Sequence, residues 1–132
     1  MRRVSKKTQA RIDECRELRQ QLVREVDRCE VCGHDPKWAR PGRIAWSLAC
    51  HEIANGPLRQ KALDKRYALL VTCWRCNSER LTDKKEWPEA RQLARLKRSR
   101  PQDYDLVAYN KLVGYGPNRV TEEEVRTWEK PR

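Results

Sequence analysis

Two pairs of cysteines carry the most specific chemical signal in the sequence. Cys29 and Cys32 enclose the dipeptide Glu-Val, and Cys73 and Cys76 enclose Trp-Arg. A CxxC pair offers two thiolates from one tight turn, and two such pairs complete the tetrahedral shell of a structural zinc ion. The pattern also fits free thiols or a redox-active pair. We favour a four-cysteine zinc site, which would clamp the base of the long loop between the pairs.

Two further residues bear on this assignment. His34 follows the first pair closely and is an alternative ligand in place of one thiolate, but four well-spaced cysteines make it a bystander. Cys15 belongs to neither pair and is expected to pack as a small apolar residue on a helix. Charged residues follow Met1, no export signal is visible, and no stretch is long enough for a membrane span. We therefore expect reduced thiols and a cytoplasmic protein.

The composition predicts a single domain, residues 1–132, with a small core. Only 38% of the 132 residues are hydrophobic and 37% are charged, so a bound metal would add needed stability. Thirty Lys and Arg against 19 Asp and Glu give a formal net charge of +11. A dispersed positive charge favours a polyanionic partner, usually nucleic acid. Ordinary solubility and a contact with ribosomal RNA are the alternatives.

The elements between the cysteine pairs are predicted to position a histidine. From Arg43 onward, bulky apolar residues alternate with smaller or polar ones, as in a strand or hairpin that ends at His51. Cys50 falls on the bulky apolar face of this strand, together with Ile44, Trp46 and Leu48. His51 falls on the other face. The apolar run 68–71 predicts a second strand, which leads into the second cysteine pair.

Helices are predicted on both sides of this core. Residues 5–27 lack Gly and Pro and form a basic N-terminal helix within 1–28, with a narrow apolar stripe that packs on the zinc module. Residues 29–83 form the zinc-bound core, with a short helix or ordered loop at 58–65 and a helix at 77–85. Residues 84–132 form a basic helical extension. Its helices are expected at 88–100, at 104–113 and after a capping box at 121–124.

The core sequence resembles a known family. A CxxCG turn, a strand ending in histidine, a second apolar strand and a CxxC followed by Asn occur in this order in HNH endonucleases of the zinc-bearing type common in phages. The segments 50–56, Cys-His-Glu-Ile-Ala-Asn-Gly, and 69–77, Leu-Leu-Val-Thr-Cys-Trp-Arg-Cys-Asn, are similar to small phage and bacterial HNH-like proteins. The resemblance covers about residues 29–80. It implies an α+β fold with a zinc-stabilised ββα-metal core and flanking helices.

The resemblance also implies a catalytic site. His51 matches the general base that activates water for attack on a phosphodiester. Asn77 matches the helix position that holds a divalent ion such as Mg²⁺ or Mn²⁺, for which an amide oxygen is a suitable ligand. The sequence departs from the family at Cys50, where Asp or His is usual, and at Ala68, where the middle Asn is expected. Nearby Glu52 and Asn55 are possible substitutes, with Glu52 as an oxygen ligand.

A basic cluster is the candidate nucleic-acid interface. It contains no acidic residue and comprises Arg91, Arg95, Lys97, Arg98 and Arg100. These side chains are expected to contact phosphates, or to form a solvated helix face. Arg2, Arg3, Lys6, Lys7 and Arg11 are a second candidate, as a basic arm on the N-terminal helix. Trp74, inside the second cysteine pair, is expected to cover the zinc or to stack on a base.

These observations favour one function and leave two rivals. The favoured function is a metal-dependent endonuclease that cuts or nicks DNA in a bacterial host cell, encoded by a phage or by the host. The first rival is a zinc-stabilised nucleic-acid-binding protein that keeps the HNH-like fold without catalysis. The second is an adaptor that binds a phage or host protein through its tryptophans.

Overall fold

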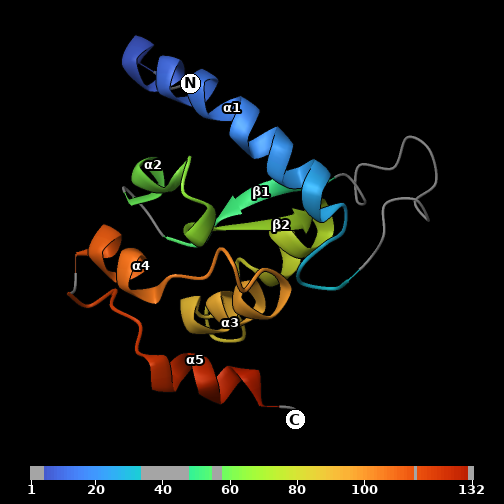
Figure 1. Cartoon of the computed structure of the whole chain (residues 1–132), viewed down its shortest axis with the longest axis vertical. Helices are drawn as coiled ribbons and strands as arrows, with labels where there is room; N and C mark the ends of the chain where they lie inside the picture. The colour runs from blue at the N-terminus through green and yellow to red at the C-terminus, as the bar shows by residue number, and fades with distance from the viewer. Residues whose placement is uncertain (1–4, 34–47, 55–57, 115, 131–132) are drawn as a thin grey trace.

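A small antiparallel sheet lies between helices in this protein. The computed structural model describes residues 5–33, 48–54, 58–114 and 116–130. Mixed helix and strand agree with the predicted α+β class (Figure 1). In chain order the elements are α1 Lys6–Val26, β1 Leu48–Glu52, α2 Arg59–Ala62, η4 Arg66–Ala68, β2 Leu69–Cys73, η5 Cys76–Arg80, α3 Glu89–Ser99, α4 Leu106–Val113 and α5 Glu122–Glu129.

The sheet consists of β1 and β2, which pair antiparallel. His51 is opposite Leu70 and Cys50 is opposite Val71 in the register. Because side chains alternate across a strand, Cys50 and His51 face opposite sides of the sheet, as the sequence predicts. Only 48–52 of the predicted strand can be compared, since 34–47, including His34 and Trp46, lie outside the described residues.

Helix α1 covers one face of the sheet. Its apolar stripe packs there, and Leu22 is buried in one cluster with Cys50, Leu69 and Val71. Cys15 is also buried, as expected of a small apolar residue. The predicted N-terminal helix is confirmed, and it begins and ends one residue inside the expected range 5–27.

The opposite face of the sheet packs on the C-terminal helices. Leu93 and Leu96 of α3 belong to the same buried cluster as Leu70 of β2 and as Cys73 and Cys76. Helix α5 lies beyond α3, on the side away from the sheet (Figure 1). The cluster extends to α5 through the buried Val125. Residues 84–130 therefore share a core with the cysteine pairs.

One predicted helix is shorter than expected. Residues 77–85 were expected to be helical, but η5 ends at Arg80 after a single wide turn. The carboxylate of Asp83 accepts hydrogen bonds from the backbone N–H groups of Lys85, at 3.1 Å, and Glu86, at 3.3 Å. Such local bonds by an Asp side chain compete with the helical ladder, so the chain turns here before α3.

The remaining helix boundaries follow local signals in the sequence. Thr121 and Glu124 form the predicted capping box at the start of α5. Asp105 caps α4 by accepting from the N–H of Ala108, and Gly114 ends that helix with a φ of 88°. None of the helices among the described residues combines the length and apolarity needed to cross a membrane.

Candidate metal centre and histidine site

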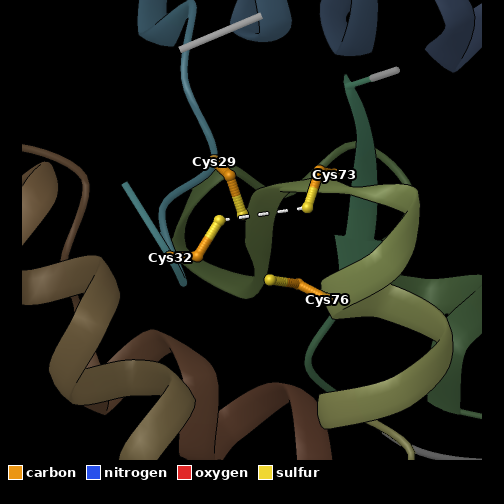
Figure 2. A group of neighbouring side chains, drawn as sticks. All are labelled: Cys29, Cys32, Cys73 and Cys76. Atoms are coloured by element: carbon orange, nitrogen blue, oxygen red, sulfur yellow. Dashed lines mark hydrogen bonds between the residues drawn. The ribbon is translucent and has the colours of Figure 1, made fainter. Parts of the chain in front are cut away.

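The four predicted cysteines come together in a single cluster. The Sγ atoms of Cys29, Cys32, Cys73 and Cys76 all lie within 4.8 Å of one another and converge on a common centre (Figure 2). Sulfurs bound tetrahedrally to one zinc ion at about 2.3 Å would be about 3.8 Å apart. The Cys32 and Cys73 sulfurs are 4.0 Å apart, which is near this value and far longer than a disulfide bond. The cluster can therefore hold a metal ion.

The first cysteine pair is shaped by a tight turn. The N–H of Gly33 donates to the carbonyl of Cys29 at 2.8 Å, which closes the turn around both thiols. Gly33 has a φ of 73°, a backbone conformation that glycine adopts without steric cost. The glycine of the CxxCG pattern is thus explained by the backbone and not by the metal.

The second pair is placed by the end of β2 and the start of η5. Cys73 is the last residue of β2 and Cys76 the first of η5, and both are buried. The Cys76 side chain donates to Cys29, and this bond lowers the pKa of the Cys29 thiol. The same bond keeps a proton on Cys76 and raises its pKa. A dication would neutralise the charge that otherwise resists further deprotonation.

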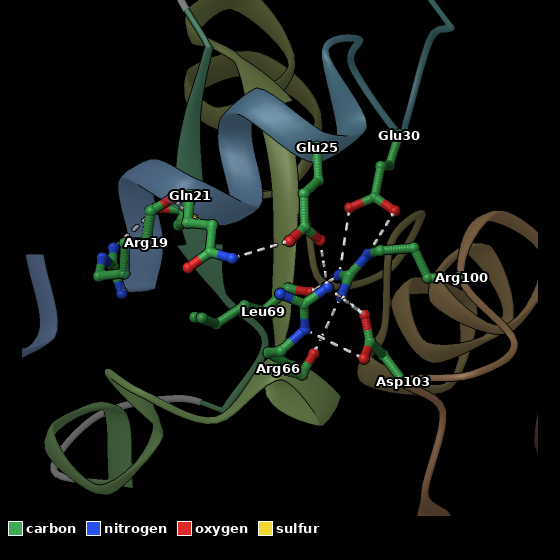
Figure 3. A network of polar contacts seen from close by, with 9 residues as sticks. Arg19, Gln21, Glu25, Glu30, Arg66, Leu69, Arg100 and Asp103 are labelled. Atoms are coloured by element: carbon green, nitrogen blue, oxygen red, sulfur yellow. Dashed lines mark hydrogen bonds and ion pairs between the residues drawn. The ribbon is translucent and has the colours of Figure 1, made fainter. Parts of the chain in front are cut away.

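A buried ion pair ties the first cysteine pair to the rest of the core. Glu30 is fully buried, and its Oε2 atom accepts from Arg100 Nε at 3.0 Å (Figure 3). Its Oε1 atom accepts from the backbone N–H of Val71 at 2.7 Å. Asp103 binds Arg100 at 2.8 Å and also binds Arg66. Burial alone would raise the pKa of Asp103, but the bonds from Arg66 and Arg100 outweigh it and lower the pKa.

Arg100 was predicted as a phosphate contact, and the structure corrects this. Its side chain is only 4% exposed, and its guanidinium binds Glu30, Asp103 and the carbonyls of Arg66 and Leu69. A guanidinium with these partners is not available to a nucleic acid. The sequence pattern placed Arg100 with its neighbours because it ends the same basic run. It follows the buried Leu93 and Leu96 by seven and four residues, a helical spacing that puts it on the buried side of α3.

The other members of the basic cluster lie along a groove between α3 and α5. The groove has a volume of about 720 Å³ and is lined by Arg91, Arg95, Lys97, Arg98, Trp128 and Lys130, among others. Arg91 stacks on the ring of Trp87 at 3.7 Å, and Lys97 pairs with Glu129 at 3.0 Å. Arg98 is exposed. Among the contacts described, Arg95 and Arg98 are therefore the members of the basic cluster that make the fewest contacts within the protein.

His51 lies on the α3 side of the sheet, between two amide side chains. Its Nδ1 atom is 3.0 Å from Oδ1 of Asn77, and its Nε2 atom is 3.0 Å from Oε1 of Gln92. Burial lowers the pKa of His51 and outweighs the opposing effect of both hydrogen bonds. The lowered pKa favours the neutral ring near pH 7, and a neutral ring has one N–H, which can donate to only one of the two amide oxygens. The sequence-predicted pair, His51 and Asn77, is thus in direct contact.

The residues on either side of His51 in the chain do not point toward a metal site beside His51. Cys50 lies under α1, where its thiol donates to the carbonyl of Arg19 at 3.5 Å and burial raises its pKa. Glu52 shares that face and pairs with Arg19 at 3.5 Å and Arg59 at 3.8 Å. Asn55 lies outside the described residues. Among the described residues, the four cysteines are the only group of three or more Cys, His, Asp or Glu side chains that could hold a metal ion.

Sequence reasoning missed Gln92. This residue is completely buried in α3, and its Nε2 atom donates to the carbonyl of Trp87 at 3.0 Å. A glutamine inside a helix carries no motif. A usable signal was its place between Ala90, Leu93 and Ala94, on the apolar side of a helix that is otherwise basic there.

The structure also places Trp74 and part of the predicted basic arm. Trp74 is 53% exposed beside the cysteine cluster. In the predicted basic arm, Arg11 pairs with Asp64 at 3.1 Å, while Lys6 and Lys7 are exposed and Arg2 and Arg3 lie outside the described residues.

Comparison with known proteins gives no further guide to the site. No protein-family model, curated protein or solved structure matches this chain.

Proposed function

We propose that this chain is an HNH-type, metal-dependent endonuclease that hydrolyses DNA phosphodiester bonds. The observation that carries the proposal is the 3.0 Å contact between His51 Nδ1 and Asn77 Oδ1. These residues were paired by the resemblance alone, and they come from a strand and from the helical turn after the second strand. Two antiparallel strands followed by such a turn have the order of a ββα-metal site.

The metal of the cysteine cluster is zinc in this proposal, and its role is structural. Four thiolates are the ligand set that structural zinc prefers, and they leave no open position for a substrate. The ion would join the turn after α1 to the end of β2. Each of these segments carries part of the buried core, so loss of the ion should loosen the sheet that supports His51.

His51 acts as the general base of the reaction. A neutral imidazole accepts a proton from water, and burial keeps His51 in this form near neutral pH. The amide oxygen of Asn77 would hold the divalent ion, which supplies stabilisation of charge on the phosphate and leaving oxygen. Gln92 contacts Nε2 of His51 and Asn77 lies beside Nδ1, so the orientation of the ring is set before a substrate arrives.

The α3–α5 groove provides the DNA contact. Its lining carries five cationic side chains against one carboxylate, that of Glu129, and so attracts a phosphate backbone. Arg95, Arg98 and Lys130 would contact phosphates directly. These contacts would position DNA without reading its sequence.

A second candidate function rests on a specific observation. Among the described residues, no hydrogen bond or ion pair joins a carboxylate to His51 or Asn77, and the neighbouring Glu52 is paired with Arg19 and Arg59. Magnesium is usually bound through at least one carboxylate. A zinc-stabilised nucleic-acid-binding protein that keeps the fold without cutting is the function that this observation favours.

Plasmid cleavage separates the two functions. Supercoiled DNA is incubated with zinc-loaded protein and Mg²⁺, Mn²⁺ or Ni²⁺ in parallel, with His51→Ala as the test variant. Lys111→Ala, which changes an exposed residue of α4, is the matched control. If the protein is a nuclease, the wild type and Lys111→Ala should both nick the plasmid, and His51→Ala should not. DNA binding without cleavage in any ion would refute the nuclease and support the binding protein.

A further inference from the structure

Gln92 stands out because it is a fully buried polar side chain whose two amide atoms have different partners. Its Nε2 atom is 3.0 Å from the Trp87 carbonyl oxygen, and its Oε1 atom is 3.0 Å from His51 Nε2. A carbonyl oxygen only accepts hydrogen bonds, so the amide nitrogen must be the atom that faces Trp87. The orientation of the Gln92 amide is therefore determined by the backbone of Trp87.

The Trp87 carbonyl needs this donor. The backbone bonds at the start of α3 run from Arg91 and Gln92 to the carbonyl of Pro88, which leaves the preceding carbonyl outside the helical ladder. A buried carbonyl without a donor costs about 1–3 kcal/mol. The Gln92 side chain satisfies it from within the helix, and that bond in turn aims the Oε1 atom at the sheet.

The orientation of the Gln92 amide determines which ring nitrogen of His51 carries the proton. An amide oxygen only accepts, so the hydrogen bond at 3.0 Å requires the proton to be on His51 Nε2. In the neutral ring the other nitrogen, Nδ1, then carries the lone pair. Nδ1 lies 3.0 Å from Oδ1 of Asn77, and two acceptors cannot share a hydrogen bond. The Gln92 amide is fixed by Trp87, whereas no second hydrogen bond fixes the Asn77 amide among the contacts described, so in this tautomer Asn77 must present its Nδ2 donor to Nδ1.

We propose that Gln92 is a positioning residue that holds His51 as the Nε2–H tautomer and so makes Nδ1 its basic nitrogen. In the nuclease, on which this inference rests for its catalytic meaning, water would lose its proton to Nδ1 beside Asn77. Gln92 touches no reacting atom. It acts through His51, from a helix outside the segment that resembles the HNH family.

The test uses two variants that differ in the atom they present to His51. Gln92→Leu and Gln92→Glu both remove the donor to Trp87, but only the glutamate keeps an acceptor facing His51. The ring of His51 is observed in zinc-loaded, ¹⁵N-histidine-labelled full-length protein by long-range ¹H–¹⁵N correlation. The chain has two histidines, and a His34→Asn variant identifies the signals of His51.

In wild type we expect a pyrrole-like ¹⁵N shift at Nε2 and a pyridine-like shift at Nδ1. Gln92→Glu should keep this pattern, whereas Gln92→Leu should give averaged shifts from a mixture of tautomers. In the cleavage assay, Gln92→Leu should be slower than Gln92→Glu by up to about 100-fold, because a positioned general base contributes about 10²–10⁴-fold to the rate.

Two results would overturn the inference. One is a wild-type spectrum that shows the proton on Nδ1. This measurement does not depend on whether any variant folds. The other is a Gln92→Leu spectrum with the same single tautomer as wild type. Absence of cleavage by the wild type would instead refute the proposed nuclease, and the spectra would still decide the tautomer.

Discussion

Glu30 and Arg100 form a buried ion pair although they are 70 positions apart in the chain. Glu30 lies inside the first cysteine pair, and Arg100 follows the last residue of α3. Their contact, with Arg100 Nε 3.0 Å from Glu30 Oε2, joins the cysteine cluster to the end of the helix that carries Gln92. The backbone N–H of Glu30 also donates to the Val71 carbonyl at 2.8 Å. The cysteine turn is therefore attached to both β2 and α3.

Removal of Arg100 should destabilise the protein strongly. Arg100→Met would leave the carboxylate of Glu30 buried without its cation, which costs about 3–5 kcal/mol. Urea unfolding of zinc-loaded protein measures this cost, and Arg98→Met is the matched control on an exposed arginine. We expect less than about 0.5 kcal/mol for the control. Equal unfolding midpoints for the two variants would contradict the buried role of Arg100.

Replacement of a cluster cysteine should remove the metal. Cys73→Ser breaks a closed four-thiolate site, so we expect loss of bound zinc and of cooperative unfolding. Cys15→Ser changes a cysteine that is equally buried but outside the cluster, and it should keep one zinc per chain. Elemental analysis and thermal unfolding measure both properties. A zinc-bound, folded Cys73→Ser protein would disprove the assignment.

The neutral form of His51 should make stability depend on pH. Since burial lowers the pKa of His51 in the folded protein, the unfolded chain binds the proton more readily. Stability from this residue is present above the unfolded pKa of about 6.5 and falls as the pH drops through that value. The advantage of wild type over His51→Gln in unfolding free energy should therefore shrink between pH 8 and pH 6. An advantage that grows as the pH falls would reverse the sign of the pKa shift.

The α3–α5 groove should account for the salt dependence of DNA binding. If about six phosphates are neutralised, the slope of log affinity against log salt is about −5. Arg95→Glu and Arg98→Glu should each weaken binding and reduce the slope by about one. Lys111→Glu makes the same change of charge on exposed α4 and should have the smaller effect. Equal effects at all three positions would indicate that DNA responds to the overall positive charge of the protein and does not contact the groove.

The sequence predicted what depends on local signals and on paired spacing. The cysteine cluster, the start and end of α1, the capping box of α5 and the side of the strand that carries His51 all follow from nearby residues. The contacts of Gln92 and Arg100 did not, because each depends on a partner far away in the chain. Gln92 meets His51 at a separation of 41 positions, and although its place on the apolar side of α3 indicates burial, that place does not identify its partner.

Arg100 shows the limit of charge patterns. The basic run of α3 and its C-cap mixes residues that line the groove with one, Arg100, whose side chain is buried in the core, and composition does not distinguish them. The burial of Arg100 depends on its acidic partners Glu30 and Asp103, one of which is 70 positions away in the chain. The length of η5 is a similar case, since Asp83 stops it through its own side chain.

The central claim is that a divalent ion is held beside His51 by Asn77, and paramagnetic broadening tests it most directly. Mn²⁺ is added in small steps to zinc-loaded protein while the ring signals of His51 and His34 are recorded. We predict that the His51 signals broaden first and that Asn77→Ala abolishes this preference. His51 signals that stay sharp at saturating Mn²⁺ would contradict the claim and leave the zinc-stabilised binding protein as the better account.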